Sequence, residues 1–210
     1  MSMILSVAQM READAYTISK GTPSIELMRR AAQGIFESYD GWQGAKTLVI
    51  CGSGNNGGDG YALAEILAAH GCDVEILRVS EKFSADGAYY YNKCGSTDII
   101  IYSVNNMEID FADYDVLVDC MLGTGFAGVP REPIASVIRK VNEAREKGAF
   151  VISADINSGM NGDTGEAELA VKSDLTVSIG CLKTGFFKDR AGSLIGKLVN
   201  ADIGIEIPHE

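Results

Sequence analysis

A glycine-rich segment with amide and acid side chains follows the first strongly apolar run of the sequence. The segment GSGNNGGDG (52–60) comes directly after TLVIC (47–51). Its first six positions satisfy G-x-G-x-x-G, in which glycines and a helix N-terminus bind the phosphates of a dinucleotide. Two asparagines and Asp59 are not required for such a phosphate site. An NAD-dependent dehydrogenase also needs an acid near the end of the next strand, where this chain has Arg78, so the dehydrogenase pattern is incomplete.

Three later glycine-rich segments each follow an apolar run and carry oxygen-bearing or charged side chains. They are DCMLGTGFAG (119–128), DINSGMNGDTG (155–165) and GCLKTG (180–185). A single glycine loop usually serves only its own turn. Because the carboxyl ends of parallel strands meet at one edge of a sheet, four such loops predict a binding cleft there.

Asn56, Asp119 and Ser158 supply three kinds of oxygen at predicted strand ends. Amide, carboxylate and hydroxyl oxygens are the ligands of hard cations, and backbone carbonyls complete such shells. With one carboxylate in the set, a monovalent cation fits better than a divalent one. Spacing alone favours the alternative, in which these are turn residues that satisfy backbone groups.

Asp155 ends the apolar run FVISA and is the candidate for acid–base chemistry. A carboxylate at such a position is partly desolvated beside a cleft, which tunes its pKa; the alternative is a residue that only opens a turn. Lys183 is expected either to pair with Asp155 or a phosphate, or to be an exposed, solubilising side chain. Asp59 is expected either to contact a ligand or to cap the following helix.

The elements that would position these residues form an alternating β/α pattern. Helical spacing covers 6–19 and 24–39, with Ser24 as the expected cap of the second helix. Strands are expected at 46–51, 73–79, 98–102, 115–119, 149–154, 174–179 and from 197, with helices at about 59–71, 83–94 and 131–147. The pattern predicts an α/β fold with a doubly wound, mostly parallel sheet and one domain over residues 1–210.

The composition limits the classes of partner and the cellular compartment that are expected for this protein. The net charge of −11 argues against nucleic acid or an anionic membrane as a partner. Five scattered cysteines indicate buried thiols in a reducing compartment, and no apolar run reaches the roughly 18 residues of a membrane span. A cytoplasmic location is therefore expected.

The four glycine-rich segments also resemble a known family. CGSGNNGGDGYALAEILAAHG (51–71), VDCMLGTGFAGVPREPI (118–134), ISADINSGMNGDTG (152–165) and LKTG (182–185) are similar to the YjeF N-terminal domain family, the NAD(P)H-hydrate epimerases. The helices within 6–32 are similar to that family's two N-terminal helices. The resemblance implies a Rossmann-like three-layer αβα sandwich, a homodimer, and an isomerase that interconverts the R and S forms of NADHX and NADPHX. These compounds are hydrated at C6 of the reduced nicotinamide ring. A dehydratase that uses ATP or ADP accepts the S form, and this chain is expected to be too short to include it.

The resemblance also implies roles for individual residues. It implies a potassium ion bound through Asn56, Asp119 and Ser158, and Asp155 is the candidate for the proton transfer that the reaction requires. The implied substrate contacts are Asn55, Asn56, Gly57, Gly58, Asp59, Gly123, Thr124, Gly125, Phe126, Ala127, Gly128, Val129 and Asp155. One departure is Asn157, where the family usually has proline, whose fixed φ is lost. The alternative function is a non-catalytic scaffold or binding module of the same fold, and joint retention of the acid and the cation ligands favours the enzyme.

Overall fold

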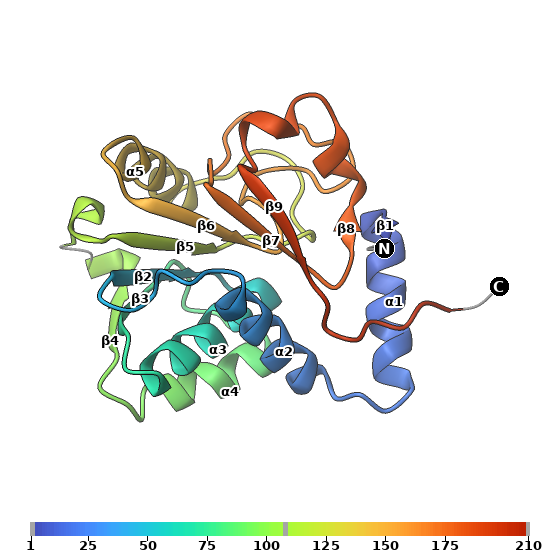
Figure 1. The fold of residues 1–210 in the computed structure, drawn as a ribbon, viewed down its shortest axis with the longest axis horizontal. Helices are drawn as coiled ribbons and strands as arrows, with labels where there is room; N and C mark the ends of the chain where they lie inside the picture. The colour runs from blue at the N-terminus through green and yellow to red at the C-terminus, as the bar shows by residue number, and fades with distance from the viewer. Residues whose placement is uncertain (1–2, 107–108, 209–210) are drawn as a thin grey trace.

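A parallel β-sheet forms the centre of the molecule (Figure 1). The computed structural model describes residues 3–106 and 109–208. Within these residues, the main sheet has seven strands in the order β4-β3-β2-β5-β6-β7-β9, all parallel. The strands are β2 (Lys46–Cys51), β3 (Asp73–Arg78), β4 (Ile100–Ser103), β5 (Val116–Cys120), β6 (Phe150–Ala154), β7 (Leu175–Ile179) and β9 (Lys197–Ala201).

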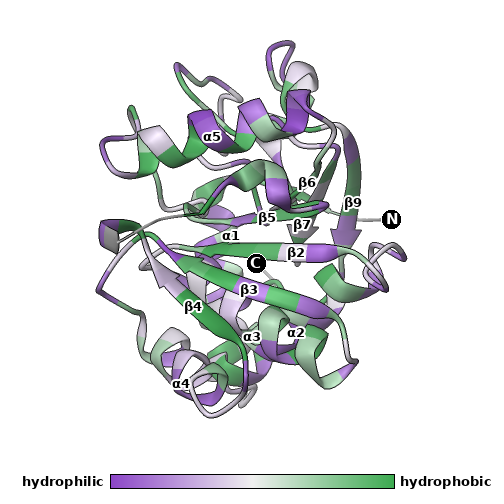
Figure 2. Ribbon diagram, turned by 90° about the vertical axis from the view of Figure 1, so that its left-hand side faces the viewer, coloured by the Kyte–Doolittle hydropathy of each residue, from purple (hydrophilic) through white to green (hydrophobic). Residues whose placement is uncertain are grey.

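Helices cover both faces of this sheet and give three layers. α2 (Ser24–Glu37), α3 (Asn55–Ala69) and α4 (Ala85–Cys94) lie on one side, and α5 (Ile134–Glu146) lies on the other (Figure 2). Successive residues of β2 alternate between two apolar cores: Val49 belongs to the core under α2–α4, and Leu48 and Ile50 to the core under α5. Because both faces are buried, the strands appear in the sequence as continuous apolar runs.

The strand order reverses between β2 and β5, and this point places the first two glycine-rich loops together. From β2 the chain continues to β3 and β4 on one side and then returns to β5 on the other. The loops meet closely, because a Cβ on Gly52 would lie 1.8 Å from the Met121 carbonyl oxygen. Ligands of open α/β sheets bind beyond the strand ends at such a reversal.

Helix α1 (Val7–Ser19) lies apart from the three layers, near the end of the chain (Figure 1). It follows a two-residue strand, β1 (Ile4–Leu5), which pairs in parallel with β8 (Leu182–Lys183). Ser6 and Gln9 form a capping box that fixes the start of α1. The segment beyond β9 runs beside the other end of the helix, where the Glu206 N–H donates to Thr17 Oγ1 at 2.9 Å.

Most of the expected elements are confirmed. The six strands expected between residues 46 and 179 are present with ends shifted by at most two residues, and the seventh is β9. Two expectations about helix starts are wrong. α3 begins at Asn55 with Gly54 as its N-cap, four residues before the expected start, and α2 begins at Ser24 itself, with Pro23 at the N-cap. The pairing of β1 with β8 was not expected, because two-residue strands have no periodicity to detect.

The cysteines and the helix lengths can be compared with the expectations from the sequence. All five cysteines are buried and free, as expected. Among the described residues, no helix combines the length and the apolar character that crossing a bilayer requires.

Candidate active site

A cavity of about 560 Å³ opens at the carboxyl edge of the sheet. The loops after β2, β5 and β6 line it together with α1 and α2, so three of the four glycine-rich segments converge as the sequence indicated. Of the residues expected to contact substrate, those that line it are Asn55, Asn56, Asp59, Gly123, Thr124, Gly125, Phe126 and Asp155. The volume lies within the range of small-molecule sites.

The other expected contacts lie away from the cavity wall. Gly57 and Gly58 are buried in the first turns of α3, where Gly57 packs on the Gly52 carbonyl and Gly58 on Met28. Ala127, Gly128 and Val129 are exposed on the loop beyond Phe126. The roles of these residues as substrate contacts stay predictions.

Asp155 directly follows β6 at this edge and has an uncommon backbone conformation. Its φ of 65° is in the left-handed region, which aspartate and asparagine adopt more readily than most non-glycine residues. Its N–H donates to the Val177 carbonyl at 2.8 Å, which ties the turn to β7. A Cβ on Gly123 would lie 3.6 Å from Asp155 Oδ2 and 3.3 Å from Asn56 Cβ, so these three loops meet at one point.

Lys183 is the ion-pair partner of Asp155, which was one of its expected roles, and the alternative of an exposed side chain is wrong. Its side chain is only 1% exposed. The ammonium donates to the Asp155 carboxylate, to Ser178 Oγ at 3.0 Å and to the Ile179 carbonyl at 3.0 Å. These contacts use all three N–H donors of the lysine, so the charge is both paired and fixed in position.

Two further carboxylates, Asp14 and Asp59, line the same cavity. Burial raises the pKa of Asp59 well above its usual range; the charges of Asp155 and Asp14 add to this, and Lys183 opposes it. Burial, followed by the charge of Asp155, raises the pKa of Asp14 to about 6, and Lys183 again opposes the shift. Asp59 does not cap a helix, because α3 begins four residues earlier.

Asp14 is a site residue that the glycine-rich motifs did not indicate. It lies in α1, outside every glycine-rich segment. The signal was nonetheless present, because Asp14 follows Met10 by four residues and precedes Ile18 by four, which places the acid in one row with two apolar residues, on the side of the helix that lines the cavity.

Asp119 and Ser158 lie fully buried behind the cavity, next to Asn56. Ser158 Oγ donates to Asp119 Oδ1 at 2.5 Å, and the Ser158 N–H donates to Oδ2 at 2.8 Å. The Leu122 N–H donates to Ser158 Oγ at 2.8 Å, and Asn56 Nδ2 donates to the Leu122 carbonyl at 3.1 Å. Burial raises the pKa of Asp119, and its hydrogen bonds from Ser158, Met121 and Ser153 oppose that shift.

The chemistry of these groups fits a monovalent cation. Asn56 Oδ1 is buried and accepts no hydrogen bond in the described part of the chain. An orphaned buried oxygen of this kind is costly unless an unseen group satisfies it. Asn56, Asp119 and Ser158 offer only oxygen ligands with a single carboxylate, which suits potassium better than a soft or divalent metal.

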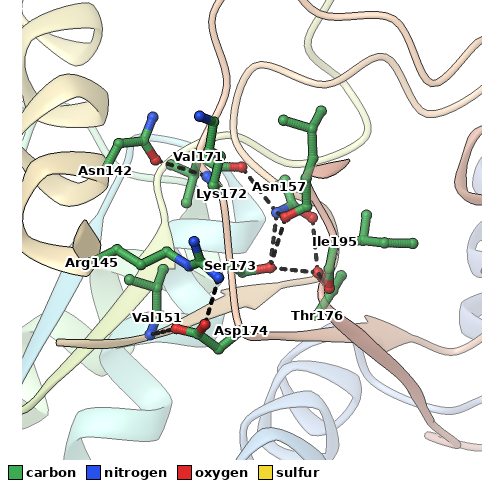
Figure 3. Close-up of polar contacts among 11 residues, drawn as sticks. Asn142, Arg145, Val151, Asn157, Val171, Lys172, Ser173, Asp174, Thr176 and Ile195 are labelled. Carbon is green, nitrogen blue, oxygen red and sulfur yellow. Dashed lines mark hydrogen bonds and ion pairs between the residues drawn. The ribbon is translucent and has the colours of Figure 1, made fainter. Parts of the chain in front are cut away.

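Asn157 anchors the loop that carries Asp155, through contacts that proline cannot make (Figure 3). Its side chain is fully buried. Nδ2 lies within hydrogen-bonding distance of three acceptors: the Val171 carbonyl at 3.0 Å, Ser173 Oγ at 2.9 Å and the Leu194 carbonyl at 2.9 Å. Oδ1 accepts from Thr176 Oγ1 at 2.9 Å. The amide therefore links the loop after β6 to residues 171–176 and to Leu194, beneath the site.

These features define a class of protein: a Rossmann-like αβα domain with a carboxylate-lined cavity at the reversal of its strand order. The fold is similar to the crystal structure of yeast YNL200c, with a TM-score of 0.77 at 19% identity over 94% of this chain and 87% of that one. Residues 24–185 match the family described as YjeF-related protein N-terminus, and the chain belongs to this family.

The similarity to individual relatives extends over nearly the whole chain. It is 35% identical to an NAD(P)H-hydrate epimerase of Lentilactobacillus buchneri, covering 98% of this chain and 96% of that protein. It is 34% identical to an NAD(P)H-hydrate epimerase of Limosilactobacillus fermentum, covering 94% and 95%. A bifunctional NAD(P)H-hydrate repair enzyme of Coxiella burnetii is 31% identical over 98% of this chain but only 42% of its own length.

Proposed function

We propose that this protein is an NAD(P)H-hydrate epimerase, an isomerase that interconverts the R and S forms of NADHX and NADPHX. The similarity to the two epimerases over almost their full length supports this assignment. The observation that carries it is the Asp155 carboxylate, which faces the cavity and is held by the buried ammonium of Lys183. A non-catalytic scaffold, the alternative, would not require this ion pair.

The cavity offers suitable groups for a dinucleotide. Asn55 and Asn56 form the first turn of α3, whose leading N–H groups have no partner within the helix. Such a helix start favours phosphate groups in spite of the net negative charge of the chain. The reduced nicotinamide ring would then reach Asp155 from the same cavity.

The reaction needs proton transfer at one oxygen. C6 of the hydrate carries a hydroxyl next to the ring nitrogen, which can expel that hydroxyl and leave a planar iminium. Water then adds to either face. Asp155 would transfer a proton to the departing hydroxyl or from the entering water, a contribution of about 10²–10⁴ in rate. Lys183 would keep the carboxylate in place throughout the cycle.

A potassium ion is part of the proposal. Asn56, Asp119 and Ser158 would hold it, and the orphaned Asn56 Oδ1 supports this assignment. Its positive charge would stabilise the approach of the loops after β2, β5 and β6.

We further propose a homodimer and a cytoplasmic location, the latter because five free, buried thiols are typical of a reducing compartment. A separate hydrate dehydratase is the proposed functional partner, since the Coxiella relative is described as a bifunctional repair enzyme. No interaction with nucleic acid or membranes is proposed, in line with the net charge of −11.

The test is exchange between the epimers. Purified R-NADPHX is incubated with the protein in potassium buffer and followed by NMR or chromatography, beside a protein-free control for the spontaneous reaction. We expect faster approach to the R/S mixture. Equal rates with and without folded, potassium-loaded protein would favour the scaffold.

A further inference from the structure

Asp14 is a cavity-lining acid to which the mechanism above gives no role. It comes from α1, whereas Asp155 comes from the loop after β6, so the two carboxylates reach the cavity from separate elements. Within residues 3–106 and 109–208, no hydrogen bond or ion pair engages the Asp14 side chain. A partly buried carboxylate without a partner costs stability, which is typical of a residue kept for chemistry.

Strand pairing and hydrogen bonds at both ends of α1 fix this helix beside the cavity. Leu5 pairs with Lys183, so the strand before α1 lies directly beside the segment that carries the partner of Asp155. The Val7 N–H donates to Asp163 Oδ1 at 2.8 Å, which ties the start of α1 to the loop after β6. Thr17 is bound at the other end through the Glu206 N–H. These anchors on both sides of Asp14 fix its position relative to Asp155.

The surroundings of Asp14 allow it to exchange a proton near neutral pH. Its charged and titratable neighbours are Asp155 and Lys183 at the sheet edge, Asp59 from α3 and Cys181 before β8. Burial and the charge of Asp155 raise the pKa of Asp14 to about 6. Asp14 therefore differs from Asp155, which has the lysine as a direct partner.

Inversion at C6 creates a geometric requirement. The departing hydroxyl and the entering water occupy opposite faces of the planar iminium. A carboxylate fixed by an ion pair faces only one of them, unless the ring turns over while bound.

We propose that Asp14 is a second catalytic residue of the epimerase, which transfers the proton at C6 on the ring face that Asp155 does not serve. The inference rests on the proposed epimerase function. In one direction, protonated Asp14 gives its proton to the C6 hydroxyl; the C–O bond breaks, the nitrogen lone pair forms the C=N bond, and water leaves. Water then adds to the other face, the C=N pair returns to nitrogen, and Asp155 takes the proton. The reverse reaction exchanges the two roles, and solvent restores the starting protonation state.

The test compares Asp14→Asn with Glu12→Gln, which removes an exposed carboxylate from the same helix. Exchange of R-NADPHX by the wild type is measured first, because a wild type that does not accelerate exchange would contradict the epimerase assignment itself. Given an active wild type, we expect Asp14→Asn to lose about 10²-fold or more in exchange rate. Binding of NADPH, measured by titration, should stay within about threefold, since an uncharged isostere preserves the cavity. Glu12→Gln should match the wild type in both measurements.

A second variant, Asp14→Glu, separates proton transfer from loss of structure. It keeps the carboxyl group and should recover at least about tenfold over Asp14→Asn. Unchanged exchange in Asp14→Asn would overturn the proposal while leaving the epimerase assignment intact. Equal losses of exchange and of NADPH binding in both variants would also overturn it, because they would show that Asp14 only supports the fold.

Discussion

Lys183 binds Asp155 from inside the protein, while Asp155 faces the cavity. The ammonium is almost fully buried, and Ser178 and Ile179 hold it from below. The Asp155 carboxylate therefore has a fixed orientation, and the positive charge of Lys183 lies on its buried side. The predicted catalytic residue is thus oriented by a group that never needs to touch substrate.

Replacing Lys183 by methionine should therefore impair both stability and exchange. The change leaves a carboxylate and two polar acceptors without their donor, which should lower the free energy of unfolding by about 3 kcal/mol. We also expect exchange to fall at least about tenfold, because Asp155 loses its orientation. Urea denaturation and the epimer assay measure the two effects. Lys188→Met, at an exposed lysine nearby, is the control, and losses equal to those of this control would contradict the role of Lys183.

Asn157 should contribute strongly to stability, although the family usually has proline at this position. Asn157→Ala removes a buried amide that serves four polar groups, at an expected loss of about 2–4 kcal/mol. Asn157→Pro should lose a similar amount, since proline restores none of these contacts. Denaturation of both variants beside Asn92→Ala, at an exposed asparagine, provides the comparison. A proline variant as stable as the wild type would show that the amide network is dispensable.

The sequence predicted the sheet well because its strands are buried on both faces and appear as apolar runs. It misplaced the start of α3, since a segment with four glycines between 52 and 58 has no helical signal of its own. Close packing on β5 fixes that helix instead, since a Cβ on Gly60 of α3 would lie only 2.8 Å from the Cβ of Cys120 in β5. The burial of Lys183 also required tertiary information, because a single lysine in the short segment GCLKTG has no periodicity. The contribution of α1 to the site was missed because it depends on β1 reaching β8 across the fold, although the spacing of Met10, Asp14 and Ile18 marked one side of the helix.

The charge on Asp14 should make stability depend on pH. Its pKa is about 6 in the folded protein and near 3.8 when unfolded, so the folded state binds more protons between these values. Stability contributed by this residue is therefore lost as pH rises from 3.8 through 6. Asp14→Asn should then be more stable than the wild type at pH 8 by about 2 kcal/mol, allowing for solvent screening, and equal to it near pH 3.5. Urea melts at several pH values test this, with Glu12→Gln as the flat control. A variant less stable than the wild type at pH 8 would contradict the expectation.

Potassium should stabilise the folded chain through Asn56. Binding to the native state alone adds about 2.7 kcal/mol when the ion is at one hundred times its Kd. We expect a higher Tm in potassium chloride than in choline chloride at equal ionic strength. Asn56→Leu should remove this difference, because it deletes the orphaned oxygen. A wild-type Tm that is the same in both salts would argue against a cation at this site.

The most direct test of the proposed mechanism is the rate of R-to-S exchange of NADPHX by Asp155→Asn beside the wild type. Asparagine suits this comparison because it tolerates the left-handed φ of 65° at this position. We expect the wild type to accelerate exchange and the variant to lose about 10²–10⁴ of that acceleration while still binding NADPH. Near-normal exchange by the variant would remove Asp155 from the chemistry and contradict the mechanism.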